Sequence, residues 1–326
     1  MYMLKGIHHV TAMTSSAEKI YDFFTYTLGI RLVKKTVNQD DIRTYHLFFA
    51  DDVGAAGTDM TFFDFPNNPK GTHGTDELAR TAFRVPSDEA LQYWQQRFEK
   101  YDVKHEAIST QFGKKILNFS DFDEQQYQLI SDEKNTGIKS GTPWQDGPIP
   151  LQFAITGLGP MTITVSNLDY FSNILTRVFE MSVIAEEGMM KLFEMGDEGG
   201  NGAQVIVRHD TSSPTARQGY GAVHHVAFRV DNKEDLTHWQ RKLEDFGYRT
   251  SGFVDRFFFG SLYVRATRHL LFEIATDGPG FMGDEPYETL GEKLSLPPFL
   301  ESKRDEIEAM VRPIDTVRST KTFKKE

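Results

Sequence analysis

Ile7-His8-His9-Val10 and Val223-His224-His225-Val226 are two copies of one short pattern, a histidine pair enclosed by β-branched apolar residues. A lone glutamate follows the second copy in another apolar stretch, Leu271-Phe272-Glu273-Ile274. Two imidazoles and one carboxylate form the ligand set that holds a divalent iron by three positions and leaves the others open. These stretches therefore indicate a metal site to which distant parts of the chain contribute.

The histidine pairs also open two of four weakly related units along the chain. Each unit begins with a short apolar strand, continues through Ser, Asn or Asp at the expected helix cap, and enters an amphipathic helix. The four openings are HHVTAMTSSAEKI from His8, TAFRVPSDEAL from Thr81, MTITVSNLDYF from Met161 and HHVAFRVDNKEDL from His224. Shorter β-type segments follow each helix and end in apolar strands at 62–65, 127–130, 204–207 and 271–274. The sequence predicts an α+β fold of four βαβββ units.

One such unit cannot cover both faces of its own sheet, so the units are expected to combine in pairs. The Gly- and Pro-rich stretch 137–159 separates units two and three and is the predicted linker. We therefore expect an N-terminal domain at 1–136, a C-terminal domain at 160–276 and a tail at 277–326. The tail is predicted to hold a short helix from Glu301 to Val311.

Composition limits the partners and the chemistry. The 326 residues carry a net charge of −11, which disfavours nucleic acids and anionic membranes because both present phosphates. The chain has no cysteine, so His and carboxylate are its strong metal ligands. It has no apolar run of bilayer length, and its start lacks the features of a signal peptide. We expect a cytoplasmic enzyme with a small, non-anionic substrate; a homo-oligomer remains open.

Four βαβββ units in two tandem pairs, with histidines in the first strand and a carboxylate in the last, resemble the vicinal oxygen chelate superfamily over about residues 4–276. The stretches HHVAFRV, DRFFFGSLYVR, LFEIATDGPGF and LPPFL resemble the branch of hydroquinone 1,2-dioxygenases and related bacterial quinone-detoxifying ring-cleaving dioxygenases. This resemblance implies two vicinal oxygen chelate domains. It also implies an Fe(II) cofactor, with Mn(II) as an alternative, and a small aromatic diol and O2 as substrates.

Successive side chains of a strand point to opposite faces, so one histidine of each pair should face the metal. The resemblance assigns this role to His9 and His225, with Glu273 as the third ligand. In the commoner extradiol pattern of this superfamily, both histidines come from units three and four. Here unit three opens with Gly159-Pro160-Met161-Thr162 and has no imidazole. The first ligand must then come from unit one, as in the hydroquinone-cleaving branch, so units one and four are expected to surround the metal.

Other site residues follow from the alternation and the resemblance. Thr11 shares a strand face with His9 and could bind a phenol or an oxygen species, or be an ordinary strand residue. His8 and His224 are either donors near the pocket or core histidines. The resemblance implies that Arg256 and Tyr263 line the pocket. No role is assigned to the remaining histidines: His46, His73, His105, His209, His238 and His269.

Asp64 leaves a second function open. Phe62-Phe63-Asp64-Phe65 is interpreted as the positional equivalent in unit one of the strand that holds Glu273. If Asp64 also bound the metal, the site would suit a lyase or isomerase of glyoxalase type, which needs no oxygen. The preferred interpretation is that Asp64 accepts hydrogen bonds at the strand end before Pro66. A binding module without catalysis is disfavoured, because such modules usually lack the metal ligands.

Overall fold

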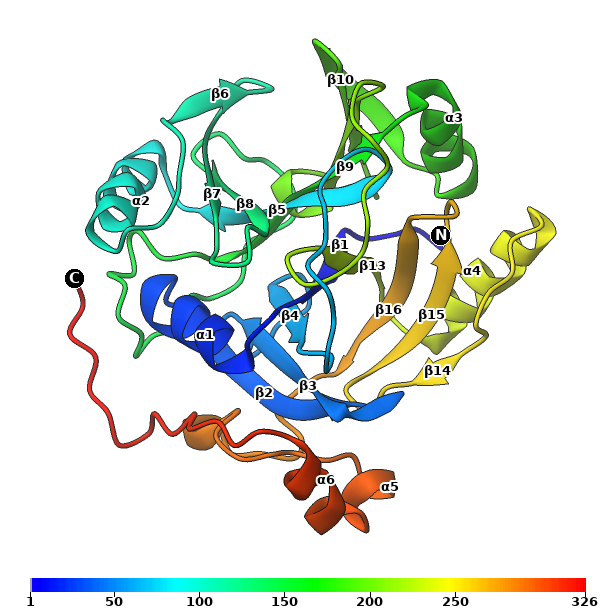
Figure 1. Cartoon of the computed structure of the whole chain (residues 1–326). Coiled ribbons are helices and arrows are strands. Elements are labelled where there is room, and N and C mark those ends of the chain that lie inside the picture. Colours follow the sequence, from blue (N-terminus) through cyan, green and yellow to red (C-terminus); the bar gives the residue numbers. More distant parts are fainter. Residues whose placement is uncertain (1) are drawn as a thin grey trace.

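The computed structural model describes residues 2–326, and its strands form two eight-stranded sheets. Figure 1 shows the two curved sheets with helices on their outer sides and the C-terminal tail beneath the first sheet. Each predicted unit is present as one strand, one helix and three further strands, so the predicted α+β class of βαβββ units is confirmed.

The first sheet contains units one and four. Unit one comprises β1 (Ile7–Met13), α1 (Ala17–Asp22) with a π-helical turn (Phe23–Thr27), β2 (Arg31–Asn38), β3 (Asp41–Ala50) and β4 (Asp59–Phe63). Unit four comprises β13 (Val223–Val230), α4 (Lys233–Asp245), β14 (Val254–Asp255), β15 (Phe259–Arg265) and β16 (Leu271–Pro279). The strand order is β14-β15-β16-β13-β1-β4-β3-β2.

The second sheet contains units two and three. Unit two comprises β5 (Glu77–Val85), α2 (Asp88–Lys100), β6 (Ser109–Gln111), β7 (Lys114–Ser120) and β8 (Gln126–Ser131). Unit three comprises β9 (Gly157–Val165), α3 (Leu168–Asn173) with a π-helical turn (Ile174–Val178), β10 (Ser182–Glu187), β11 (Met190–Glu194), a 3-10 turn (Asn201–Ala203) and β12 (Gln204–His209). The strand order is β10-β11-β12-β9-β5-β8-β7-β6.

The sheets combine units across the expected domain boundary. β1 pairs antiparallel with β13, and β5 pairs antiparallel with β9, so each sheet takes one unit from either half of the chain. The pairing of units one and four is the arrangement expected from the missing imidazole of unit three. The division into domains along the chain stays a prediction, and the last residues of the predicted linker, 157–159, belong to β9.

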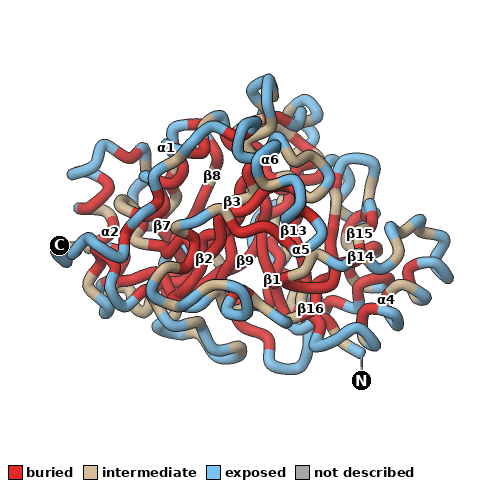
Figure 2. Tube along the Cα trace, turned by 90° about the horizontal axis from the view of Figure 1, so that it is seen from below, coloured by how far each residue is buried: buried red, intermediate tan, exposed pale blue. Residues whose placement is uncertain are grey.

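The convex sides of the sheets share one apolar core. Phe24, in the π-helical turn after α1, contacts Phe49 and Phe62 of the first sheet as well as Phe83 and Tyr127 of the second. Figure 2 shows the buried residues gathered in the middle of the molecule. The helices close this core with the apolar faces of their amphipathic sequences, which include Trp94 and Trp239, both fully buried. The concave faces are thereby left free for sites.

The C-terminal tail lies against the edge strand β2. It contains a 3-10 turn (Tyr287–Thr289), α5 (Pro298–Glu301) and α6 (Arg304–Met310), so the short predicted helix is present with a later start. Within residues 2–326, no helix combines the length and the apolar character needed to cross a membrane.

Candidate metal centre

The two histidine pairs lie on the central strands β1 and β13, at matching irregularities of the ladder. His9 is opposite Ala227 and Ile7 is opposite Phe228, so His8 is an extra residue in β1. Farther along, His224 is in the same way an extra residue in β13. A β-bulge of this kind re-aims a side chain. Both histidines of each pair therefore contact one another on the concave face, which simple alternation does not predict.

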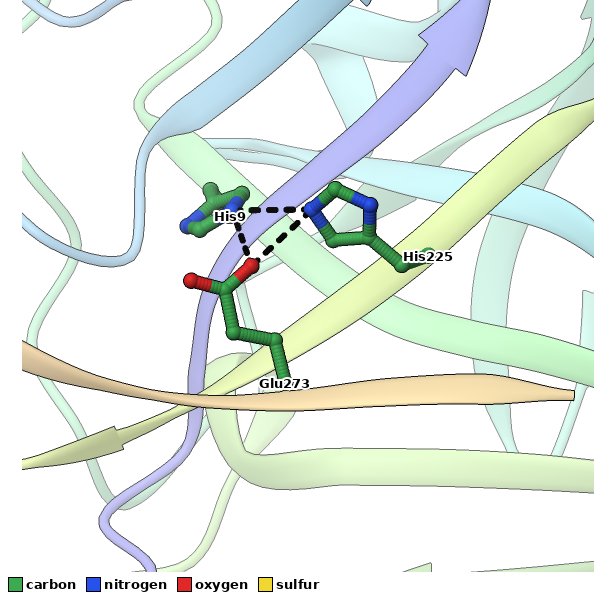
Figure 3. A group of neighbouring side chains, drawn as sticks. All are labelled: His9, His225 and Glu273. Atoms are coloured by element: carbon green, nitrogen blue, oxygen red, sulfur yellow. Dashed lines mark hydrogen bonds and ion pairs between the residues drawn. The ribbon is translucent and has the colours of Figure 1, made fainter. Parts of the chain in front are cut away.

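His9, His225 and Glu273 converge at one point of this face (Figure 3). Their three facing atoms are close together: His9 Nε2 lies 3.3 Å from His225 Nε2, and Glu273 Oε2 lies 3.2 Å and 3.0 Å from these two nitrogens. Three ligand atoms that each lie about 2.1 Å from one cation, with right angles between their bonds to it, are about 3.0 Å from one another. The spacing of the three atoms suits a facial set of metal ligands.

The protonation pattern of His9 can be inferred from its neighbour. His8 Nε2 lies 3.1 Å from the carbonyl oxygen of Thr276, which can only accept, so Nε2 carries the proton. Burial, with help from His9, lowers the pKa of His8 to about 3, so His8 is neutral and its Nδ1 accepts. Nδ1 of His8 lies 2.9 Å from Nδ1 of His9, which must donate. In the neutral ring, the Nε2 atom of His9 is then a lone pair aimed at the Glu273 carboxylate.

Glu273 completes a donor set that lacks a counter-charge. The carboxylate is fully buried, and its Oε2 atom accepts no hydrogen bond from residues 2–326, whereas Oε1 accepts one from Ser261 at 2.5 Å. Burial opposes ionisation of this carboxyl group, and His9 and His225 can lower its pKa only when they direct a proton at it. Lone pairs of nitrogen and oxygen that converge in a buried site require a cation. These residues therefore fit a bound divalent metal.

A cavity of about 390 Å³ opens beside these residues, and it is the right size for a small aromatic molecule. His9 and His225 line it together with three of the residues expected from the sequence, His224, Arg256 and Tyr263. The remaining wall includes the mostly polar segment 36–41 and five phenylalanines: Phe48, Phe63, Phe65, Phe258 and Phe259.

Arg256 and Tyr263 form one hydrogen-bonded pair in this wall. Arg256 Nε donates to the Tyr263 hydroxyl at 3.2 Å, and its Nη2 pairs with Asp40 at 2.9 Å. Burial would lower the pKa of Arg256, but Tyr263 and Asp40 raise it, so the guanidinium stays charged. Burial and Glu273 raise the pKa of Tyr263, so its hydroxyl keeps the proton. The pair offers the cavity a fixed cation and a phenolic donor.

The other two expected residues, His8 and Thr11, lie behind the cavity wall. His8 is the partner of His9 described above. Thr11 is fully buried, and its hydroxyl lies 2.7 Å from that of Thr61 on the neighbouring strand β4.

His46 is a cavity residue that the sequence reasoning missed. It lines the cavity, and its Nε2 lies 2.9 Å from the Thr61 hydroxyl, which links it to Thr11. Its ring packs between Phe48 and Phe63, with centroids 3.9 and 4.4 Å away. The alternation of side chains along β3 could have indicated this position. Tyr45 and Leu47 belong to the core, so His46 between them faces the concave side.

Asp64 lies outside the ligand group. Its Oδ1 accepts a hydrogen bond from the backbone N–H of Tyr45 at 2.7 Å, just beyond the end of β4. The ladder also corrects the assumed equivalence of Asp64 and Glu273. In unit four, Glu273 pairs with Ala227, which stands five residues before the helix cap Asn232. In unit one, the residue five positions before the helix cap Ser16 is Thr11, and Thr11 pairs with Thr61. Thr61, not Asp64, is the counterpart of Glu273, because the strand ends two residues earlier than the apolar run suggests.

Comparison with known proteins agrees with this fold. The model of the Glyoxalase/Bleomycin resistance protein/Dioxygenase superfamily matches residues 6–126 and 157–278. “Putative ring-cleaving dioxygenase MhqA” of Bacillus subtilis is 42% identical over 95% of this chain and 99% of that protein. “Chlorohydroquinone/hydroquinone 1,2-dioxygenase” of Sphingobium indicum is 29% identical over 93% of this chain and 95% of that protein.

A solved structure supports the same assignment. The crystal structure of a “putative dioxygenase” from Bacillus subtilis has a TM-score of 0.87 and 32% identity, over 96% of this chain and 98% of that one. The chain therefore belongs to the glyoxalase, bleomycin resistance protein and dioxygenase superfamily.

Proposed function

We propose that this protein is an iron(II)-dependent ring-cleaving dioxygenase that opens hydroquinone-type aromatics with O2. The observation that carries the proposal is the convergence of His9, His225 and Glu273 at an aromatic-walled cavity. Relatives named for ring cleavage, one of them for hydroquinone, support the same reaction. A bound ferrous ion would supply the electron transfer between a singlet aromatic substrate and triplet oxygen.

The protein groups around the cavity have distinct tasks in this reaction. The aromatic wall holds the substrate ring and excludes water, which strengthens every polar contact inside. Tyr263 donates its hydroxyl hydrogen to a substrate oxygen, and the charged Arg256 stabilises negative charge that develops there. Burial and His225 lower the pKa of His224 to about 3, so this histidine is neutral and serves as a hydrogen-bond partner in the cavity.

The para-diol is favoured over a catechol by the make-up of the cavity. A catechol chelates a metal through two neighbouring oxygens, whereas a hydroquinone offers one oxygen and must be oriented by the protein. Arg256, Tyr263 and His224 line the cavity with the metal ligands and form such an orienting set. The loss of one orienting hydrogen bond should cost about 1–3 kcal/mol, a roughly tenfold to hundredfold fall in kcat/KM. Tyr263→Phe and His224→Ala are therefore expected to be active but impaired.

The test is anaerobic loading with iron(II), followed by oxygen uptake with a panel of diphenols. We expect about one iron per chain and uptake with hydroquinone or an alkyl- or halo-substituted hydroquinone. Faster cleavage of catechols than of every hydroquinone, at equal iron content, would refute the para-diol assignment and leave the dioxygenase in place. No uptake by the iron-loaded protein with any diphenol would refute the dioxygenase.

Metal analysis of two carboxylate variants separates this reaction from the glyoxalase-type alternative. Glu273→Ala should lose iron and turnover, since it removes a donor of the converging set. Asp64→Ala should keep iron, because Asp64 is engaged with the Tyr45 backbone at the strand end. Equal loss of metal from both variants would contradict the three-ligand site.

We further propose a cytoplasmic location for this protein.

A further inference from the structure

The second sheet repeats the plan of the metal-binding sheet. Its central strands β5 and β9 correspond to β1 and β13, and its flanking strands β8 and β12 correspond to β4 and β16. Arg80 stands seven residues before the helix cap Ser87, as His9 stands seven residues before Ser16. The bulge is also kept, because Ala79 is an extra residue beside Arg80 in the ladder with β9. Arg80 therefore occupies the position that His9 holds in the first sheet.

The other two ligand positions of the first sheet also hold different residue types in the second sheet. The counterpart of His225, seven residues before the cap Asn167, is Pro160. The counterpart of Glu273 on β12 is Ile206, which pairs with Thr162. Two residues farther along β12, and so on the same concave face, lies Arg208. Where the first concave face carries the candidate metal ligands, the second concave face therefore carries two guanidinium groups.

Within residues 2–326, neither guanidinium forms an ion pair with a carboxylate. Among residues 2–326, Arg80 makes one side-chain hydrogen bond, from Nη2 to Gln126 at 3.1 Å. Arg208 likewise makes one, from Nη2 to the Thr164 hydroxyl at 3.1 Å. The Nε atom of each arginine is buried without a hydrogen-bond partner in the same range. Burial lowers the pKa of Arg80, Glu106 opposes this, and the nearby Arg208 lowers it further.

Arginines that stabilise this fold look different. Arg84, on the same strand as Arg80, pairs with Asp132 at 2.8 Å, and Arg229 pairs with Asp277 through two hydrogen bonds at 2.8 and 2.9 Å.

Arg97 and Arg318 are also buried, and within residues 2–326 neither has a carboxylate partner, but each donates to two backbone carbonyl oxygens: Arg97 to Tyr26 and Thr27, and Arg318 to Leu32 and Leu290. Arginines buried for structure thus have a carboxylate or two carbonyl acceptors, whereas Arg80 and Arg208 each have one neutral side-chain acceptor. Two half-buried cations with neutral partners carry an uncompensated desolvation cost, which an anionic ligand would offset.

Each of the two arginines lines a cavity that can take such a ligand. Arg80 lines a cavity of about 360 Å³, whose other cationic or titratable groups are His73, Lys104, His105, Glu106 and Glu124. Glu106 accepts a hydrogen bond from Asn118 at 2.9 Å, and Glu124 pairs with Lys70 outside. Arg208 lines a second cavity, of about 680 Å³, whose other titratable groups are Glu187, His209 and Asp210. Both carboxylates accept hydrogen bonds there, Glu187 from the Phe112 backbone and Asp210 from Ser212 and Ser213. The planar guanidinium matches the geometry of carboxylate and phosphate oxygens.

We propose that the concave face of the second sheet binds a small oxyanion, a carboxylate or phosphate, through Arg80 with Arg208 as the second cation. This site is separate from the metal centre, and its occupancy does not depend on the proposed dioxygenase reaction.

The test is calorimetric titration and thermal unfolding of the full chain with sodium maleate, sodium phosphate, and sodium chloride at equal ionic strength. Maleate or phosphate at about ten times its Kd should raise the unfolding midpoint by roughly 2 °C, and chloride should not. A larger effect of maleate assigns the site to carboxylates, and a larger effect of phosphate to phosphate groups. Equal effects of all three salts would overturn the proposal.

Variants locate the effect. Arg80→Met and Arg208→Gln should each weaken binding at least about tenfold, while the exposed Arg249→Gln should bind like the wild type. Without ligand, Arg80→Met should be as stable as the wild type, because it removes an uncompensated charge. If Arg80→Met does not fold, Arg208→Gln carries the test. Undiminished binding in Arg208→Gln and in any folded Arg80 variant would overturn the proposal, and unchanged iron content in both variants separates it from the metal centre.

Discussion

At the scale of single residues, His46 is the group whose role the structure adds to the cavity. Burial, together with His9 and His225, lowers its pKa well below the ordinary value, so the ring is neutral. It is half-buried in the cavity wall and joined through Thr61 to Thr11. A neutral imidazole in an aromatic wall can orient a polar ring substituent without adding charge.

We predict that His46→Phe keeps the packing against Phe48 and Phe63 but lowers kcat/KM for hydroquinones about tenfold, the effect of one lost hydrogen bond. Iron content should be unchanged, since His46 is not among the converging donors. Steady-state oxygen uptake and metal analysis check both statements. His269→Phe, an exposed position, is the control and should match the wild type. Loss of iron from His46→Phe would contradict the assignment.

Asp121 gives a prediction of pH dependence. Burial raises its pKa to about 7, although its carboxylate accepts hydrogen bonds from Tyr127 and from two backbone N–H groups. The folded state then binds a proton that the unfolded chain releases near pH 3.8. The contribution of Asp121 to stability is therefore lost as pH rises from about 4 to about 7, by at most about 1.4 kcal/mol per pH unit.

Asp121→Asn should remove this part of the pH dependence and leave a flatter profile over the same range. Urea unfolding of both proteins at several pH values measures the difference. Asp245→Asn, at an exposed position, should leave the wild-type slope unchanged. An unchanged slope in Asp121→Asn would show that this carboxyl group is not the one that titrates.

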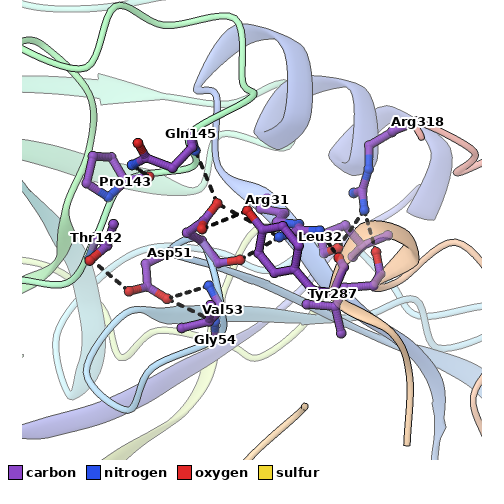
Figure 4. A network of polar contacts seen from close by, with 12 residues as sticks. Arg31, Leu32, Asp51, Val53, Gly54, Thr142, Pro143, Gln145, Tyr287 and Arg318 are labelled. Carbon is purple, nitrogen blue, oxygen red and sulfur yellow. Dashed lines mark hydrogen bonds and ion pairs between the residues drawn. The ribbon is translucent and has the colours of Figure 1, made fainter. Parts of the chain in front are cut away.

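At the scale of elements, the segment after β3 joins the first sheet to the linker and the tail (Figure 4). Asp51 Oδ1 accepts hydrogen bonds from the backbone of Val53, Gly54 and Ala55 at 2.9 to 3.2 Å, and Oδ2 accepts one from Thr142 at 3.0 Å. The next residue, Asp52, accepts from the Tyr287 hydroxyl at 2.8 Å. One buried turn thus ties three separate parts of the chain together.

Asp51→Ala should lower the free energy of unfolding by about 2–3 kcal/mol, because several buried N–H groups lose their acceptor. Asp51→Asn should cost less, since the amide oxygen can still accept from the turn. Urea denaturation of both variants measures the two costs. Asp146→Ala, an exposed linker position, is the matched control with little expected effect. Equal destabilisation by Asp51→Asn and Asp51→Ala would contradict an acceptor role.

At the scale of the whole molecule, the two halves of the chain cannot complete a sheet alone. β1 needs β13, and β5 needs β9, and each pair joins one strand from either half. The proposed metal ligands are divided in the same way, with His9 in the first half and His225 and Glu273 in the second. The proposed metal site is therefore completed together with the fold.

We predict that the fragments 1–136 and 137–326, purified separately, each bind iron at least about a hundredfold more weakly than the intact chain. Mixing them should restore iron binding and the circular dichroism of the whole protein, because the missing ladders re-form. A second fragment that folds and binds iron alone as tightly as the full chain would refute this prediction.

Much of the fold was readable from local pattern. The four strand-and-cap openings and the apolar stripes predict the βαβββ units, because capping and helical periodicity are short-range properties. The absence of an imidazole from the opening of unit three, residues 159–162, predicts that units one and four surround the metal. His9, His225 and Glu273 were expected as ligands from their residue types and from the resemblance, and the structure brings them together.

Tertiary structure alone decided the features that depend on register between distant strands. The bulges at His8 and His224 turn both histidines of each pair to the same face, and no local sequence signal marks an unpaired residue in a ladder. The same ladder makes Thr61 the counterpart of Glu273 and sets Asp64 aside, and it places His46 in the cavity wall. The sequence determined which side chains can do the chemistry; long-range strand pairing determined which of them meet, because register is set by the partner strand rather than by neighbours in the chain.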